Sequence, residues 1–206
     1  MTNATGMMWR QRSEGMEVKR QDIPDSQRLT LESEVCYLRM EYAGCSMSSE
    51  EIQSAWELLK EACQYQAGGD YDMAVELYKR SLELHPTAEA HTFLGWAYHY
   101  QGKVEDAIAQ CKKAIQLDPD FGNPYNDIGA YLIEKGQLDE ALPWLERALQ
   151  SSRYESYHFA HYNLGRIYMT KEMYGKARHH FAEALKLCEN YSPAKEGLQN
   201  VCRKLQ

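Results

Sequence analysis

Histidine side chains are the first candidates for chemistry in this chain, because imidazole nitrogens bind metals and transfer protons. His158 and His161 are three residues apart, which places their rings on one face of a helix, and His91 and His99 lie in an earlier segment. No carboxylate or thiolate stands at a spacing that completes a ligand set around either pair. We therefore expect no metal and no cofactor, and we expect His91 and His161 to pack at helix contacts.

Cysteines and catalytic motifs give no stronger signal for an enzyme. The chain has six cysteines: Cys36, Cys45, Cys63, Cys111, Cys188 and Cys202. None forms a C-x-x-C pair, so buried free thiols are expected rather than a redox or disulfide system. A G-x-S-x-G elbow and a glycine-rich phosphate loop are both missing from the sequence. We predict no catalytic residue and no enzyme activity.

The charge and hydrophobicity of the chain restrict its partners. The net charge is −7 and the lysines and arginines are scattered among acids, which argues against a nucleic-acid partner. No segment approaches the roughly 18 consecutive apolar residues that span a bilayer, and the first residues lack the apolar core of a signal peptide. These features predict a cytoplasmic protein without a membrane span.

A recurring sequence motif indicates which secondary-structure elements carry these residues. The sets are Leu94-Gly95-x-x-Tyr98, Ile128-Gly129-x-x-Leu132 and Leu164-Gly165-x-x-Tyr168. Four alanines, at 74, 107, 141 and 177, follow at intervals of 33, 34 and 36 residues. A period near 34 fits one helix-turn-helix unit per repeat. The small residues indicate places where two helices approach closely.

The repeated pattern resembles the tetratricopeptide repeat family. The second repeat carries His91, Leu94-Gly95, Tyr98, Ala107 and Pro119 at the signature positions, and the fourth matches at most of them. The first repeat lacks the Leu-Gly pair. The third has Arg153 where a proline normally closes the unit. The resemblance covers about residues 50–191.

This resemblance implies an all-α fold, a right-handed α-solenoid of about four repeats that binds proteins or peptides. The expected ranges are a disordered tail at 1–26, an extra helix and linker at 27–48, repeats within 49–191 (about 55–87, 88–121, 122–157 and 158–191), and a capping helix at 192–206. The extra helix either covers the edge of the first repeat or folds into the binding groove. The apolar side of the capping helix, with Leu198, Val201, Cys202 and Leu205, is expected to seal the last repeat.

In this family the first helix of each repeat lines a concave groove. Applied to this sequence, the family pattern predicts that the groove contains Leu59, Cys63, Thr92, Trp96, His99, Asn126, Ile133, Tyr162, Arg166 and Met169. The lining is mostly apolar or aromatic and suits an apolar extended segment or an amphipathic helix, with Arg166 available to a carboxylate. An alternative is that Trp96 and Tyr162 only pack against adjacent helices.

A family branch that clamps the C-terminal carboxylate of chaperones is not indicated. The clamp positions fall on Leu59, Cys63, Phe93, Asn123 and Asp127, which supply neither lysine nor arginine. The favoured function is a non-catalytic scaffold or adaptor; the alternative is an escort chaperone that shields an apolar segment of a client. The partner and the oligomeric state are not predicted.

The junction between the third and fourth repeats is the most irregular part of the repeated region. The segment 151–157 is two residues longer than the corresponding segments between the other repeats, and it lacks the proline that ends a repeat. The preceding helix could therefore overrun, or the superhelix could shift at this point. Tyr154 and Tyr157 either contact a partner or wedge between hairpins.

Overall fold

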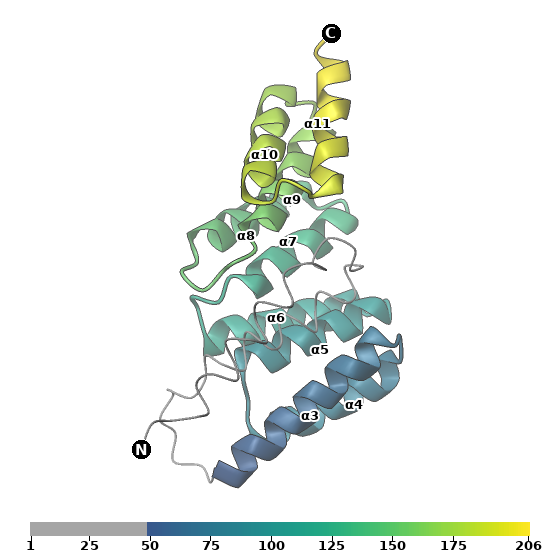
Figure 1. The fold of residues 1–206 in the computed structure, drawn as a ribbon, viewed down its shortest axis with the longest axis vertical. Coiled ribbons are helices and arrows are strands. Elements are labelled where there is room, and N and C mark those ends of the chain that lie inside the picture. Colours follow the sequence, from purple (N-terminus) through teal and green to yellow (C-terminus); the bar gives the residue numbers. More distant parts are fainter. Residues whose placement is uncertain (1–48) are drawn as a thin grey trace, which may run out of the picture. The chain divides into compact units, whose positions relative to one another are not determined.

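The computed structural model describes residues 49–206, all of whose regular elements are helices (Figure 1). The predicted tail at 1–26 and the predicted segment at 27–48 lie outside the described residues. The helices are α3 (Ser49–Ala67), α4 (Tyr71–Leu84), α5 (Ala88–Tyr100), α6 (Val104–Leu117), α7 (Asn123–Glu134), α8 (Leu138–Gln150), α9 (Tyr157–Thr170), α10 (Tyr174–Leu187) and α11 (Ser192–Lys204). The predicted all-α repeat fold is confirmed.

The helices pack as four successive pairs followed by a single helix. α3 packs on α4, α5 on α6, α7 on α8 and α9 on α10, and each second helix also contacts the first helix of the next pair (Figure 1). First helices additionally touch one another directly, α3 with α5 and α7 with α9, and α9 also touches α11. Side chains on the first helices of different repeats can therefore interact.

Small residues let the helices of each pair approach closely. The alanines at 74, 107, 141 and 177 are fully buried. A Cβ atom added at Gly129 would lie 2.5 Å from Leu145 Cδ2, and one at Gly165 would lie 2.6 Å from Phe181 Cδ1. Both distances are too short for carbon atoms in contact. Gly129 and Gly165 thus make room for a bulky side chain of the paired helix.

The four turns inside the helix pairs share one backbone conformation. Gly69, Gly102 and Gly136 have φ of 84°, 76° and 76°, the left-handed region that favours glycine. In the fourth pair Glu172 occupies the equivalent place with φ of 58°. The turn geometry is therefore kept in the fourth repeat although its sequence lacks the glycine.

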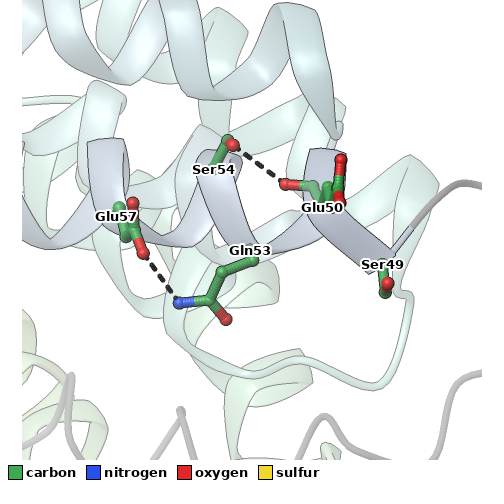
Figure 2. Close-up of a pocket in the computed structure, with 5 residues that line it drawn as sticks. All are labelled: Ser49, Glu50, Gln53, Ser54 and Glu57. Atoms are coloured by element: carbon green, nitrogen blue, oxygen red, sulfur yellow. Dashed lines mark hydrogen bonds between the residues drawn. The ribbon is translucent and has the colours of Figure 1, made fainter.

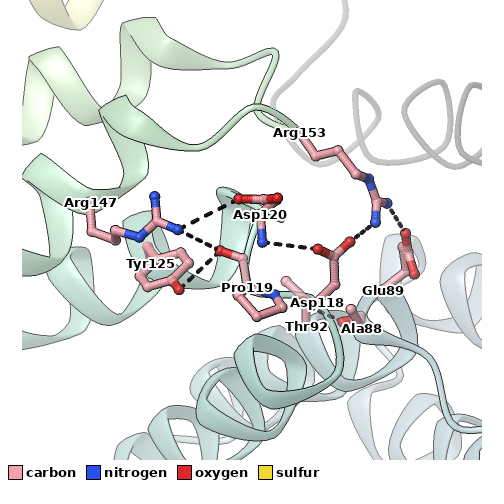
Figure 3. A network of polar contacts seen from close by, with 9 residues as sticks. All are labelled: Ala88, Glu89, Thr92, Asp118, Pro119, Asp120, Tyr125, Arg147 and Arg153. Atoms are coloured by element: carbon pink, nitrogen blue, oxygen red, sulfur yellow. Dashed lines mark hydrogen bonds and ion pairs between the residues drawn. The ribbon is translucent and has the colours of Figure 1, made fainter.

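The loop between α8 and α9 joins elements of three repeats (Figure 3). α8 ends at Gln150 without overrunning, and the loop forms an isolated parallel bridge with Phe121 through Arg153. The Arg153 guanidinium makes ion pairs with Glu89 at the start of α5 and with Asp118 at the end of α6. The two additional residues therefore belong to a loop that links the second, third and fourth helix pairs.

Tyr154 in the same loop is buried, and its side chain occupies the space that a Cβ at Gly122 would need. It fills the junction between hairpins, as the wedging interpretation proposed.

α11 behaves only partly as predicted: Val201 is buried, but Cys202 is exposed and Leu205 is 51% exposed. The helix covers the fourth pair with Ala194 and Val201, whereas Cys202 and Leu205 are not part of that seal.

Candidate functional site

The predicted binding residues of the last three repeats occupy three repeating positions on the first helices. The three rows are Thr92, Asn126 and Tyr162; Trp96, Ala130 and Arg166; and His99, Ile133 and Met169. Successive members are 34 and 36 residues apart, so each row marks one side of α5, α7 and α9. We refer to the side that carries these rows as the first-helix face.

The structure divides the predicted residues by their exposure. Leu59, Cys63, Thr92 and Asn126 are buried, and they contribute mainly to helix packing. The Thr92 hydroxyl donates to the Ala88 carbonyl at 2.8 Å, and the Tyr78 hydroxyl donates to Cys63 Sγ at 3.3 Å. Burial raises the pKa of the Cys63 thiol, so the reactive thiolate is disfavoured. The partly exposed residues are Trp96, His99, Ile133, Tyr162, Arg166 and Met169.

A buried carboxylate fixes the indole of Trp96. Trp96 Nε1 donates to Asp127 Oδ2 at 2.5 Å, which connects α5 to α7. Asp127 is 8% exposed, and Asn126 Nδ2 lies 3.4 Å from its other oxygen. Because the hydrogen bond to a charged acceptor restricts the ring, Trp96 presents its remaining surface in one orientation.

The hydrogen bonds continue from α7 to α9. Asn163 Nδ2 donates to Asn126 Oδ1 at 3.1 Å, and Arg166 Nη1 donates to Asn163 Oδ1 at 3.1 Å. Four side chains thus form a series of hydrogen bonds, in which Arg166 and the two amides each donate to the next residue and the carboxylate of Asp127 accepts the last. The series orients both amides and holds the guanidinium of Arg166 at the first-helix face.

His99 is held by partners on α7. Its Nε2 lies 2.7 Å from Glu134 Oε2, and its ring stacks on Tyr131 with 4.5 Å between centroids. The contact therefore connects α5 to α7 near the end of the first-helix face. Tyr131 is buried, and burial raises the pKa of its hydroxyl well above the ordinary range, so it stays protonated at neutral pH.

On α9, Arg166 lies beside Tyr162, whose ring is packed against other aromatic residues. The Arg166 guanidinium lies 5.8 Å from the centre of the Tyr162 ring. Tyr162 packs against Phe181 of α10 and edge-on against Tyr191, with centroid distances of 5.9 and 5.3 Å. Met169 belongs to the same apolar cluster. Tyr162 and Met169 therefore pack on one side against this cluster and remain partly exposed to solvent.

Asp127 and Asn163 belong to this arrangement but were not among the predicted groove residues. Their signal in the sequence was a polar residue directly before a core position of the first helix, Ile128 or Leu164. A polar side chain at such a place needs a hydrogen-bond partner. Sequence reasoning could have identified the need for a partner, but not which partner is used.

The other histidine, cysteine and acidic side chains do not form a second candidate site in the part of the chain that the structure describes. Among the described residues no three histidine, cysteine or acidic side chains are placed to hold a metal. His161 and His180 face each other, and His91 binds Gln110, so both predicted packing histidines contact the second helix of their own pair. Within residues 49–206 no helix is long and apolar enough to cross a bilayer.

A surface pocket lies along α3 (Figure 2). Its described lining is Ser49, Glu50, Gln53, Ser54 and Glu57. The Ser54 hydroxyl donates to the Glu50 carbonyl at 2.8 Å, and Gln53 Nε2 donates to Glu57 Oε1 at 2.9 Å. The serine hydroxyl is thus bonded to its own helix rather than to a base that would activate it.

These features define a class, the helical-hairpin repeat proteins, in which stacked first helices present a side-chain face. The chain belongs to the tetratricopeptide repeat family: residues 59–120 and 120–190 each match a family model described as tetratricopeptide repeat. Proteins of this family generally mediate protein–protein interaction.

Individual relatives share only part of their length with this chain. The chain is similar to small glutamine-rich tetratricopeptide repeat-containing protein 2 of Mycosarcoma maydis, 28% identical over 50% of this chain and 30% of that protein. It is also similar to the type IV pilus assembly protein PilF of Pseudomonas aeruginosa, 25% identical over 61% of this chain and 50% of the relative.

Solved structures support the same fold. The structure of PilF of Pseudomonas aeruginosa has a TM-score of 0.71 at 21% identity, covering 76% of this chain and 71% of the other. The crystal structure of MamA has a TM-score of 0.59 at 24% identity, covering 69% and 83%. At this level of identity the likeness concerns the fold alone.

Proposed function

We propose that this protein is a non-catalytic scaffold or adaptor that binds an apolar segment of a partner protein on its first-helix face. The observation that carries the proposal is the set of partly exposed apolar side chains on that face: Trp96, Ile133, Tyr162 and Met169. They occupy repeating positions, and hydrogen bonds or aromatic neighbours hold Trp96 and Tyr162 from behind.

Such an arrangement suits binding because the contact residues are already ordered. A large aromatic side chain buries much area at an interface, and one that is fixed beforehand loses little conformational entropy on binding. Trp96 and Tyr162 belong to α5 and α9, so a segment that contacts both must cross α7 and Ile133. An extended strand or an amphipathic helix presents side chains at intervals suited to this path.

Site-specific crosslinking tests the proposal. A photoreactive amino acid placed at Met169 should crosslink a partner from the native cell, whereas the same group at Lys112, an exposed residue of α6, should not. The double variant Trp96→Ala with Tyr162→Ala should then reduce capture of that partner by at least about tenfold, since interface aromatic residues often contribute about 2 kcal/mol or more.

A matched control uses apolar residues on second helices. Leu117 and Leu187 are 50% and 55% exposed near the ends of α6 and α10. Leu117→Ala with Leu187→Ala should leave capture unchanged. If this control weakens capture while Trp96→Ala with Tyr162→Ala does not, and circular dichroism shows both folded, the first-helix face is not the site.

The proposed location is the cytoplasm. It is supported by the acidic composition and the mean hydropathy of −0.65. Fractionation of cells that express the full chain would test it, and recovery with membranes or in the medium would contradict it.

A further inference from the structure

Arg166 stands out on the first-helix face because its contacts are neutral. Within residues 49–206 its guanidinium donates to the amide of Asn163 and lies over the ring of Tyr162, and it forms no ion pair. Arg147 and Arg153, by contrast, each pair with an acid. A guanidinium carries five N–H donors, and the bond to Asn163 uses one of them.

The amide chain restricts where this cation can lie. Arg166 donates to Asn163, Asn163 donates to Asn126, and Asn126 faces the buried carboxylate of Asp127. Each group therefore has a defined orientation, and the guanidinium needs little reorganisation to accept an anion. An arginine fixed in this way is suited to a carboxylate, which matches its planar fork with two parallel hydrogen bonds.

The charges of the described repeats are unevenly distributed along the chain. Residues 151–206 contain nine lysines and arginines against five acids. Residues 49–150 contain eight against eighteen. An acidic segment is therefore attracted to the fourth pair and the capping helix, and it is repelled by the first three pairs. Complementary charge of this kind determines where a segment is placed on a surface.

We propose that the bound segment is acidic as well as apolar, and that it presents an aspartate or glutamate carboxylate to Arg166. Apolar neighbours of that acid would contact Tyr162 and Met169, which flank Arg166 by four and three residues on α9. This inference rests on the proposed function and adds the chemistry of the partner and its placement over α9.

Selection from a random peptide library tests the chemistry of the bound segment directly. The full chain is immobilised and used to select peptides displayed on phage. Enriched peptides should carry an aspartate or glutamate next to aromatic or aliphatic residues. In fluorescence anisotropy, replacing that acid by its amide should weaken binding by about tenfold, because a charge-assisted hydrogen-bonded pair is lost. Added salt should weaken the binding of the acidic peptide more than the binding of its amide version.

A pair of arginine variants separates this inference from a general charge effect. Arg166→Met retains an unbranched apolar stem and should bind the acidic peptide and its amide version equally. Arg178→Met removes the same charge from an exposed position on α10 and should keep the discrimination. Enriched peptides without acids, or discrimination that persists in Arg166→Met, would overturn the inference. If the peptides nevertheless lose binding with Trp96→Ala and Tyr162→Ala, the proposed function stands without it.

Discussion

The Nδ1 atoms of His161 and His180 lie 3.1 Å apart across the contact between α9 and α10. The equivalent contact in the second repeat, 70 residues earlier for both partners, joins His91 Nδ1 to Gln110 Oε1 at 2.8 Å. A glutamine oxygen accepts a hydrogen bond from histidine whether the imidazole is neutral or protonated. Two histidines can share one proton, but they repel each other when both are charged.

Acid should therefore weaken the fourth helix pair more than the second. Burial and the neighbouring histidines lower the pKa of His180 from 6.5 to about 4, and burial lowers the pKa of His161. The unfolded chain then binds protons more strongly than the folded chain. The stabilisation is present above about pH 6.5 and is lost as pH falls towards 4. Allowing for partial exposure, we expect a loss on the order of 1–2 kcal/mol, measured by urea unfolding across this range.

The variant His180→Gln should reduce this acid sensitivity by copying the contact of the second repeat. The nearby charged groups Lys176 and Glu183 on α10 remain in place, and so does the ring of Tyr168 that stacks on position 180. His179→Gln, at the neighbouring exposed position, removes a smaller contribution to the lowered pKa of His180 and should reduce the acid sensitivity by less. Equal acid sensitivity in His180→Gln and the wild type would show that the histidine pair is not responsible.

Replacing Arg153 should destabilise the protein strongly. Glu89 is 1% exposed, and its ion pair with Arg153 supplies the compensating positive charge (Figure 3). Arg153→Met leaves that carboxylate buried without its cation, which typically costs about 3–5 kcal/mol. Chemical unfolding monitored by circular dichroism would measure the loss.

The double variant Arg153→Met with Glu89→Gln provides the matched comparison. Neutralising the acid removes the uncompensated charge, so the double variant should be more stable than Arg153→Met alone. If the two variants are equally unstable, the cost comes from another part of the loop, such as the packing of Arg153 over the Phe121 ring.

Glycine at position 172 should stabilise the fourth turn. Glu172 has φ of 58°, a conformation that costs a side-chain-bearing residue about 1–2 kcal/mol. Glu172→Gly should raise the free energy of unfolding by roughly 1 kcal/mol, because part of that gain is offset by the greater freedom of glycine in the unfolded chain. Gly102→Ala, at φ of 76° in the second turn, should lower it by a similar amount. Thermal unfolding of the two variants would contradict the argument if both shifts had the same sign.

Most of the fold could be predicted from the sequence because its signals are local and repeated. Gly129, Gly165 and the buried alanines mark close helix contacts. Because small residues recur at the same position in successive repeats, each repeat is separate evidence for the same helix pair. The conformation of Glu172 was not predicted, since nothing in its residue type favours it. Neighbouring helices fix the ends of that turn, and their packing overrides the local preference.

The candidate site was less predictable because its contacts join different repeats. The pattern placed Trp96 and Arg166 on the first helices, but the carboxylate that holds Trp96 comes from α7, and the amide that holds Arg166 is linked to another amide 37 residues away. Arg153 shows the same limit: its partners Glu89 and Asp118 are 64 and 35 residues away. Such pairings depend on how the hairpins stack.

Alanine should have opposite effects at two glycines of the fourth helix pair. At Gly165 the new methyl group would lie 2.6 Å from the Phe181 ring, in a tightly packed region, and overpacking of this kind costs about 1–3 kcal/mol. At Gly175, in the first turn of α10, nothing lies within 4 Å of the added atom. There alanine should stabilise by up to about 1 kcal/mol through its higher helix propensity. Urea unfolding of Gly165→Ala and Gly175→Ala compares them directly, and a stabilising Gly165→Ala would show that this glycine is not needed for helix contact.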